Sequence, residues 1–175
     1  MNIKVSSKSL NLLFHPCTEN FITNVCKGKC CQGSDRIMVT IHESEIIDEK
    51  FNGEKVINNF LIPDHRNLCP FKNISGLCNI HKNKPIGCIF SPFTLNKNNT
   101  LIIRYRYIQL PCYRIKENKA PSYIAFRKSL ETIFKDNVDF VIDKIIKDKV
   151  DFYINIDEDI YNKLKENDLY KKGIR

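Results

Sequence analysis

The sequence lacks a hydrophobic run long enough to cross a membrane and lacks a recognisable export signal. Hydrophobic residues make up 42% of its 175 positions, but no apolar stretch approaches the ~18–20 residues that a transmembrane helix needs. The first 14 residues carry only a short apolar patch, without the apolar core and cleavage site of a signal peptide. The sequence therefore predicts a cytoplasmic protein with no membrane partner.

Glycine is scarce, with only six in the whole chain. None of them forms the glycine-rich strand–turn–helix fingerprint that binds nucleotide-type cofactors. This absence argues against an enzyme built on a conventional nucleotide-binding fold. No internal repeat is apparent in the sequence.

Cysteine, by contrast, is abundant and unevenly placed. All eight cysteines lie between Cys17 and Cys112, and none follows in the last third of the chain. In a reducing compartment such cysteines are more often metal ligands or reactive groups than disulfides. We therefore expect a metal ion or an iron–sulfur centre held by a cluster of thiolates.

The spacing of the cysteines favours tight turns around this cluster. Three of them fall within the segment 26–31, where Gly28 and the following Gly33 supply the freedom to turn sharply. The later cysteines stand beside or near proline and glycine, as in short knuckles. Such turns aim backbone N–H groups at sulfur and stabilise thiolates.

The residues leave the identity of the metal open. Tetrahedral sulfur sites suit zinc, iron or an iron–sulfur cluster, and the paired short spacings of structural zinc ribbons are absent. The adjacent pair Cys30-Cys31 could serve two centres, or one of the two could be a free thiol. Histidine can replace a thiolate, and His81 is a better candidate than His15, His42 or His65 because it lies among the later cysteines.

The fold class predicted is α+β, with a small cysteine-rich metal-binding core of short strands and loops and a C-terminal helical segment. Residues 1–115 form the metal-binding domain, and residues 116–175 form helices packed on it. Strands are predicted over 36–41, 55–62, 93–95 and 100–108, and one or two helical turns over 42–49. Three helices are predicted after Pro121, from apolar residues at helical spacing and an acidic start at 157–159.

The cysteine motifs resemble the YkgJ-type cysteine-cluster family. The resemblance rests on Cys26-x3-Cys30-Cys31-x-Gly, Cys69-Pro-Phe, Gly-x-Cys78-x-Ile-His and Lys-Pro-x-x-Cys88-x-x-Ser-Pro-Phe. Members of that family are taken to chelate zinc or iron, and they share their cluster with flagellin lysine-N-methylases. The resemblance implies a ligand set of Cys26, Cys30, Cys31, Cys69, Cys78 and Cys88. The placement of Cys17 and Cys112 adds both to that set.

Two other functions stay open at this point. One is a metal-dependent enzyme related to the flagellin lysine methylases, for which the catalytic residues are unknown. The other is a zinc-scaffolded module that binds nucleic acid or a protein partner. Its support is the net charge of +8 and the stretch 104–107, which as a strand would place arginines on one face and tyrosines on the other.

Overall fold

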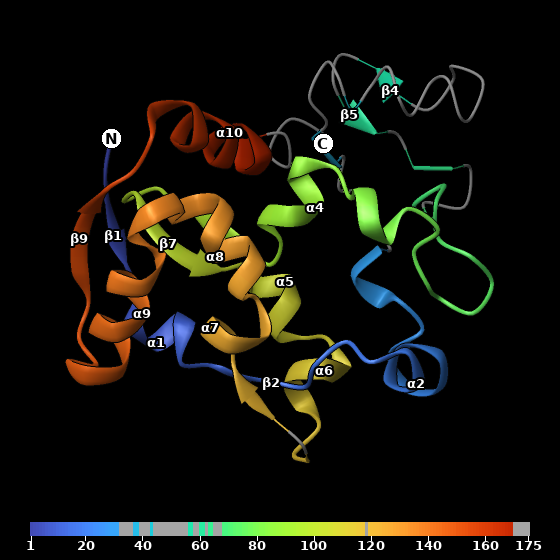
Figure 1. Cartoon of the computed structure of the whole chain (residues 1–175). Helices are drawn as coiled ribbons and strands as arrows, with labels where there is room; N and C mark the ends of the chain where they lie inside the picture. The colour runs from blue at the N-terminus through green and yellow to red at the C-terminus, as the bar shows by residue number, and fades with distance from the viewer. Residues whose placement is uncertain are drawn as a thin grey trace. The chain divides into compact units, whose positions relative to one another are not determined.

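The computed structural model describes residues 1–31, 37–38, 43, 56–57, 60–61, 63–64, 68–117 and 119–169. The chain, drawn in Figure 1, divides into two compact units. Unit 1 comprises Met1–Pro16 and Phe90–Asp168, and unit 2 comprises Cys17–Ile89 and Leu169–Arg175. The predicted α+β class with a C-terminal helix is confirmed. The domain boundary predicted at residues 115/116 falls inside unit 1.

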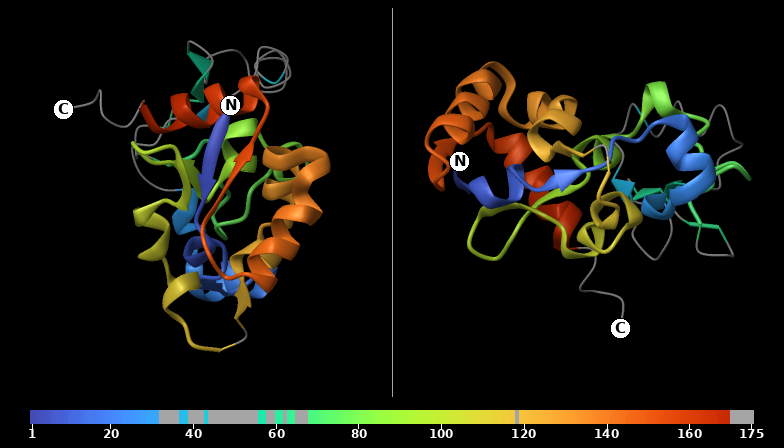
Figure 2. Two further views of the ribbon diagram at one scale, coloured as in Figure 1. Left: turned by 90° about the vertical axis from the view of Figure 1, so that its left-hand side faces the viewer. Right: turned by 90° about the horizontal axis from the view of Figure 1, so that it is seen from below.

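A four-stranded mixed sheet forms the centre of unit 1. Its strand order is β6-β7-β1-β9, where β1 is Asn2–Val5, β6 is Phe93–Leu95, β7 is Thr100–Ile103 and β9 is Phe152–Asn155. Strand β1 runs parallel to β7 and antiparallel to β9 (Figure 2). The predicted hairpin of β6 and β7 is confirmed, with Phe93 opposite Ile103. Strands β1 and β9 were not predicted.

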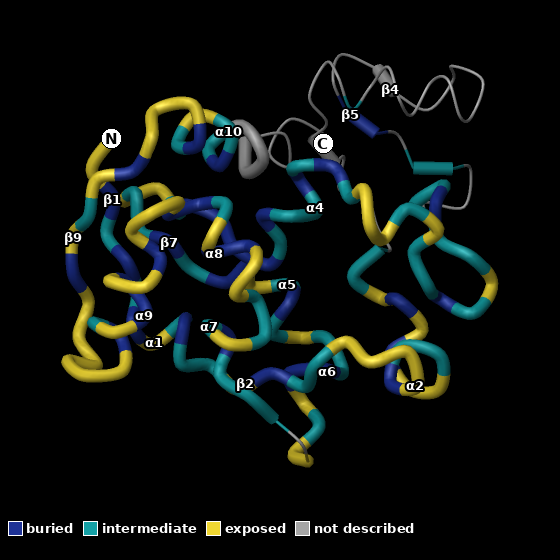
Figure 3. Tube along the Cα trace, in the orientation of Figure 1, coloured by how far each residue is buried: buried dark blue, intermediate teal, exposed yellow. Residues whose placement is uncertain are grey.

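Helices cover this sheet; those after residue 121 were predicted from their apolar spacing, and those at 7–10, 105–108 and 111–114 were not. They are α1 (Ser7–Leu10), α5 (Tyr105–Ile108), α6 (Pro111–Arg114), α7 (Ser122–Ala125), α8 (Arg127–Phe134), α9 (Val138–Lys147) and α10 (Glu158–Leu169). Leu130 and Ile133 of α8 and Ile145 of α9 are at most 1% exposed, whereas Phe140 of α9 is 57% exposed. Figure 3 shows both buried and exposed residues along these two helices. A short pair of strands, β2 (Leu13–Phe14) and β8 (Ala120–Pro121), completes the unit.

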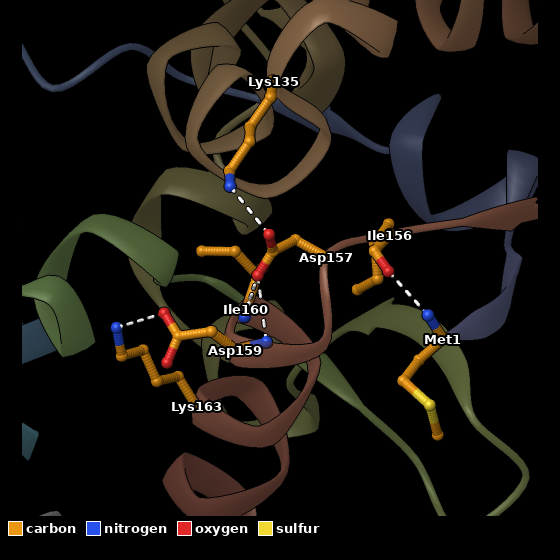
Figure 4. Close-up of polar contacts among 7 residues, drawn as sticks. All are labelled: Met1, Lys135, Ile156, Asp157, Asp159, Ile160 and Lys163. Atoms are coloured by element: carbon orange, nitrogen blue, oxygen red, sulfur yellow. Dashed lines mark hydrogen bonds and ion pairs between the residues drawn. The ribbon is translucent and has the colours of Figure 1, made fainter.

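The start of α10 is capped as its acidic sequence predicts (Figure 4). Asp157 Oδ1 accepts the N–H groups of Asp159 at 2.9 Å and Ile160 at 3.2 Å. Lys135 Nζ lies 3.0 Å from Asp157 Oδ2. Just before the cap, the Met1 amine donates to the Ile156 carbonyl at 2.6 Å, which ties β1 to the end of β9.

The strand predicted over 100–108 is wrong in its second half. The ladder ends at Ile103, and Tyr105–Ile108 form α5. Arg104 donates its N–H to the Pro92 carbonyl at 3.0 Å, just before the partner strand β6 begins, so no strand backbone lies opposite the following residues. The arginines and tyrosines therefore do not alternate across a sheet, which removes the stacking surface predicted there.

Unit 2 consists of short elements. They are α2 (Glu19–Phe21), the π-helical turn η1 (Ile22–Cys26), the 3₁₀ turns η2 (Lys29–Cys31) and η3 (His81–Asn83), α4 (Ile86–Phe90, whose last residue belongs to unit 1), and the strands β3 (Ile37–Met38), β4 (Val56–Ile57) and β5 (Phe60–Leu61). The strand predicted over 55–62 is instead two strands, since Ile57 pairs with Phe60 across two intervening residues. The turns predicted over 42–49 lie outside the described residues, except for Glu43.

Among the helices that the structure describes, none combines the length and the apolar character needed to cross a bilayer.

Candidate metal centre

The two compact units divide the cysteines unequally. Seven belong to unit 2, and only Cys112 belongs to unit 1, where it is buried in α6 and its carbonyl accepts the His15 N–H at 2.8 Å. None of the eight forms a disulfide. In unit 2 they come from four separate segments, which are residue 17, residues 26–31, residues 69–78 and residue 88.

The first cysteine segment turns back sharply on itself. Thr18 caps α2 by accepting the Phe21 N–H at 3.2 Å, and η1 ends when Lys27 and Gly28 adopt φ angles of 53° and 60°. The next turn closes when Cys31 donates its N–H to the Gly28 carbonyl at 2.9 Å. As predicted, positive φ at a glycine brings Cys26, Cys30 and Cys31 into one reversal of the chain.

This reversal lies directly against a second loop through a pair of glycines. A Cβ atom on Gly28 would come within 2.2 Å of the Gly76 carbonyl oxygen, and one on Gly76 would come within 2.6 Å of the Lys27 carbonyl carbon. Cys69 also donates its N–H to the Cys31 carbonyl at 3.1 Å. The first and second cysteine groups, separated by 38 positions in the sequence, therefore meet backbone to backbone.

Near Cys69 and Cys78, two loops are each closed by a pair of hydrogen bonds of the same kind. Asp64 and Leu68 exchange hydrogen bonds, since the Asp64 N–H donates to the Leu68 carbonyl at 2.8 Å and the Leu68 N–H donates to Asp64 Oδ1 at 3.0 Å. Asn73 and Leu77 repeat both bonds, each at 2.9 Å. A side-chain oxygen that accepts a backbone N–H four residues ahead fixes a short loop without strand partners.

Each of these closed loops places a cysteine immediately after its leucine. Cys69 follows Leu68 and Cys78 follows Leu77, so the same pair of hydrogen bonds, followed by a cysteine, recurs nine positions further along the chain. Sequence analysis missed this repeat. The signal that could have revealed it is Asp or Asn four positions before a Leu-Cys pair, occurring twice.

Backbone amides point at the sulfur in the first copy of this repeat. The N–H groups of Phe71 and Lys72 hydrogen-bond to the Cys69 thiol and lower its pKa, although desolvation has the larger effect and raises it. Hydrogen bonds from backbone N–H to sulfur stabilise a thiolate and are typical of metal-binding knuckles. Lys72 then pairs with Cys78 through an isolated antiparallel bridge.

Cys88, the last cysteine of unit 2, forms the fourth segment. The His81 N–H donates to the Cys78 carbonyl at 3.2 Å and begins η3, and the Cys88 N–H donates to the Pro85 carbonyl at 2.8 Å within the first turn of α4. His81 itself is exposed. Lys84 stands between these turns.

The sulfur atoms are close enough to affect one another's ionisation. The hydrogen bond with Cys30, followed by desolvation and the charges of Cys30, Cys69 and Cys88, raises the pKa of Cys31 strongly. Desolvation and then the charges of Cys69 and Cys78 raise the pKa of Cys88, and Lys84 opposes both effects. These effects therefore favour the protonated thiols of Cys31 and Cys88, and a bound cation would favour their thiolates instead.

Cys17 is electrostatically part of the same cluster. It is exposed, yet desolvation by the surrounding protein, followed by the charges of Cys30 and Cys26, raises the pKa of its thiol to about 12. Lys84 lowers this pKa, as it does for Cys88. All seven cysteines of unit 2 are thus joined by mutual electrostatic effects or by the backbone contacts above.

The cysteine thiols of unit 2 are suitable ligands for a thiophilic metal, and two of their sulfur atoms have the separation expected of two ligands of one ion. The Sγ atoms of Cys30 and Cys31 are 3.8 Å apart. Two ligands of a tetrahedral site with metal–sulfur bonds of about 2.3 Å are separated by about 3.8 Å. Across the described part of the chain, however, no three His, Cys, Asp or Glu side chains already converge as the ligands of one ion would. Of the other histidines, His15 belongs to unit 1, and His42 and His65 lie outside the described residues.

No protein family model, curated protein or solved structure matches this chain. The resemblance to the YkgJ-type family therefore stays a prediction.

Proposed function

We propose that the protein binds zinc, iron or an iron–sulfur cluster through the thiolates of unit 2. The observation that carries the proposal is the sulfur pair of Cys30 and Cys31, whose 3.8 Å separation suits two ligands of one tetrahedral site. It lies in a unit that holds seven cysteines from four segments, none of them in a disulfide. The centre serves a structural or an electron-carrying role.

The residues proposed as ligands are the cysteines that the backbone contacts of unit 2 bring together. Cys30, Cys31, Cys69, Cys78 and Cys88 are linked by hydrogen bonds and by their mutual charges. Cys17 and Cys26 belong to the same unit and extend the donor set. Cys112 lies in unit 1, and its share in the centre stays a prediction.

The chemistry of these cysteines also indicates the cellular compartment of the protein. Eight cysteines without a disulfide suit a reducing compartment, where glutathione and thioredoxin keep cysteines reduced. We therefore place the protein in the cytoplasm. Binding of a metal draws protons off thiols that otherwise hold them, so metal affinity rises with pH.

The test is elemental analysis of protein purified without oxygen, together with its visible absorption spectrum. Zinc in a colourless sample indicates a structural site, and iron with inorganic sulfide and a brown colour indicates an electron-carrying cluster. Cys69→Ser should lose metal, whereas Ile74→Ala, an exposed position in the neighbouring loop, should keep it. A wild-type protein that is well folded and free of metal would refute the proposal.

A further inference from the structure

Positive and negative charges are unevenly distributed along unit 1. Residues 91–128, which include α5 and α6, contain eight lysines and arginines but a single acidic residue, Glu117. Residues 129–168 contain six basic and eleven acidic residues. The lysines of these later helices pair with carboxylates four positions away, as Lys144 does with Asp148 at 2.8 Å. The positive excess of the unit therefore comes mainly from residues 91–128.

The cations around α6 form hydrogen bonds to uncharged oxygens. Arg114 Nη2 donates to Gln109 Oε1, and Lys119 Nζ donates to the Tyr113 carbonyl at 2.8 Å. Lys116, in the short segment between the two cations, is exposed. Because amide and carbonyl oxygens carry no net charge, these bonds orient the cations without neutralising them. An anion that reaches this surface meets three positive charges and one carboxylate within six positions of the chain.

An exposed aromatic ring belongs to the same surface. Tyr105, at the start of α5, is 77% exposed, whereas Tyr107 is 8% exposed. Gln109 ends α5 with near-helical backbone angles (φ −82°, ψ −9°), so it lies on the same face as Tyr105, four positions earlier. The hydrogen bond between Gln109 and Arg114 then connects this face to the cations of α6. The ring and the cations therefore adjoin on two consecutive short helices (Figure 1).

We propose that single-stranded nucleic acid binds to the α5–α6 surface, which consists of Tyr105, Gln109, Arg114, Lys116 and Lys119. An unpaired base stacks on the Tyr105 ring, since every base has a flat face that can lie on an aromatic side chain. Arg114 and the two lysines contact the phosphates, which a planar guanidinium binds through two hydrogen bonds. The surface belongs to unit 1 and uses none of the proposed metal ligands, so it does not depend on the metal centre.

The exposed ring favours a single strand over other polyanions. The bases of a duplex are stacked on their neighbours, whereas those of a single strand can turn a face toward an aromatic side chain. Helices α5 and α6 have four residues each, or about 6 Å of length, which is too short to follow the major groove of a duplex. An acidic peptide would bind the cations but leave the Tyr105 ring unused.

The test is fluorescence anisotropy of labelled oligo(U) and oligo(dT) strands, each of about 12 nucleotides, titrated with the full chain. We expect the wild type to bind, and the tighter of the two strands identifies RNA or DNA as the ligand. Tyr105→Ala should weaken binding about 5- to 100-fold because one stacked base is lost, and Tyr105→Phe should bind like the wild type. Tyr153→Ala is the matched control, since Tyr153 is 68% exposed on β9 and should not contribute.

The salt dependence of binding tests the cations. Arg114→Gln and Lys116→Gln should each weaken binding and reduce the slope of log affinity against log salt by about 0.7, the value for one phosphate contact of a single strand. Lys147→Gln is the control, because Lys147 on α9 lies 3.5 Å from the Asp143 carboxylate, and it should leave the slope unchanged.

Three results would overturn the inference. The first is a wild type that binds neither strand. The second is a Tyr105→Ala variant that binds like the wild type, which would leave only unspecific attraction between charges. The third is binding of a duplex of the same length, or of polyglutamate, as tightly as the single strands, which would indicate a different class of partner.

Discussion

Replacement of Gly76 by alanine tests whether close backbone contact assembles the cysteine unit. Gly76 has a φ of 88°, and an added Cβ would meet the Lys27 carbonyl carbon at 2.6 Å and the Gly28 nitrogen at 2.9 Å. The left-handed conformation costs an L-residue about 1–2 kcal/mol, and forcing a methyl group into a packed contact costs about 1–3 kcal/mol more. We therefore expect Gly76→Ala to lower the free energy of unfolding by about 2–5 kcal/mol.

Urea unfolding followed by circular dichroism measures this loss, since the chain contains no tryptophan to report by fluorescence. With a denaturant slope of about 2 kcal/mol per molar, the unfolding midpoint should fall by about 1–2.5 M. Ile74→Ala is the control within the same loop, because the Ile74 side chain is fully exposed, and it should unfold like the wild type. Metal content should fall in Gly76→Ala and remain unchanged in Ile74→Ala.

The double variant separates the two causes of the loss. Gly28→Ala forces the same two backbone segments apart, since its Cβ would lie 2.2 Å from the Gly76 oxygen. Once one alanine has separated them, the second no longer meets the contact, so the double variant should lose less stability than the two single variants combined. Single variants that unfold within about 0.5 kcal/mol of the wild type would refute the close approach.

Two further predictions concern local structure. Asn73→Ala removes the oxygen that accepts the Leu77 N–H, and it should lower the free energy of unfolding in urea by about 1–2 kcal/mol. A loss no larger than that of Ile74→Ala would contradict the role of this hydrogen bond in closing the loop. The hydrogen bond from Lys135, followed by the N–H of Ile160, lowers the pKa of Asp157 in the folded protein. The charge of Asp157 therefore stabilises the fold fully above the usual carboxyl pKa of about 3.9. This stabilisation is lost as the pH falls through the lowered pKa of the folded protein. Asp157→Asn should therefore melt below the wild type at neutral pH, the two melting temperatures should converge as the pH falls through the lowered pKa of Asp157, and a difference independent of pH would exclude the ion pair as its cause.

The elements that sequence analysis predicted correctly depend on local patterns. The apolar spacing of α8 and α9 and the acidic start of α10 are visible within a dozen residues. The hairpin of β6 and β7 encloses Asn96, whose side chain accepts the Thr100 N–H at 3.0 Å, so its turn is also local. Such features need no knowledge of the rest of the chain.

The elements that were missed depend on distant partners. Asn2–Val5 looks unremarkable in sequence, because its neighbours in the sheet are β7 and β9, which lie about 100 and 150 positions away. The segment Tyr105–Ile108 has strand-like composition, but it is a helix because its potential partner strand begins only at Phe93. Composition favours a strand only where a partner is present.

The candidate metal centre was partly visible in the sequence. The grouping of the cysteines and the need for a glycine at position 28 could be read from spacing alone. The contact of Gly28 with Gly76 and the repeated loop closures at Asp64 and Asn73 could not, because each depends on two segments or on hydrogen bonds that composition does not specify.

The position of β1 in the sheet sets an order of events during synthesis. Among the described strands, β1 is made earliest, and its neighbour β9 is made about 150 residues later. At a translation rate of about 5–20 residues per second, β1 waits roughly 8–30 s for that partner. Residues 17–89, which hold seven of the cysteines, emerge in the meantime. We therefore expect the cysteine-bearing unit to begin folding, and to meet its metal, before the sheet that encloses the N-terminal strand can close.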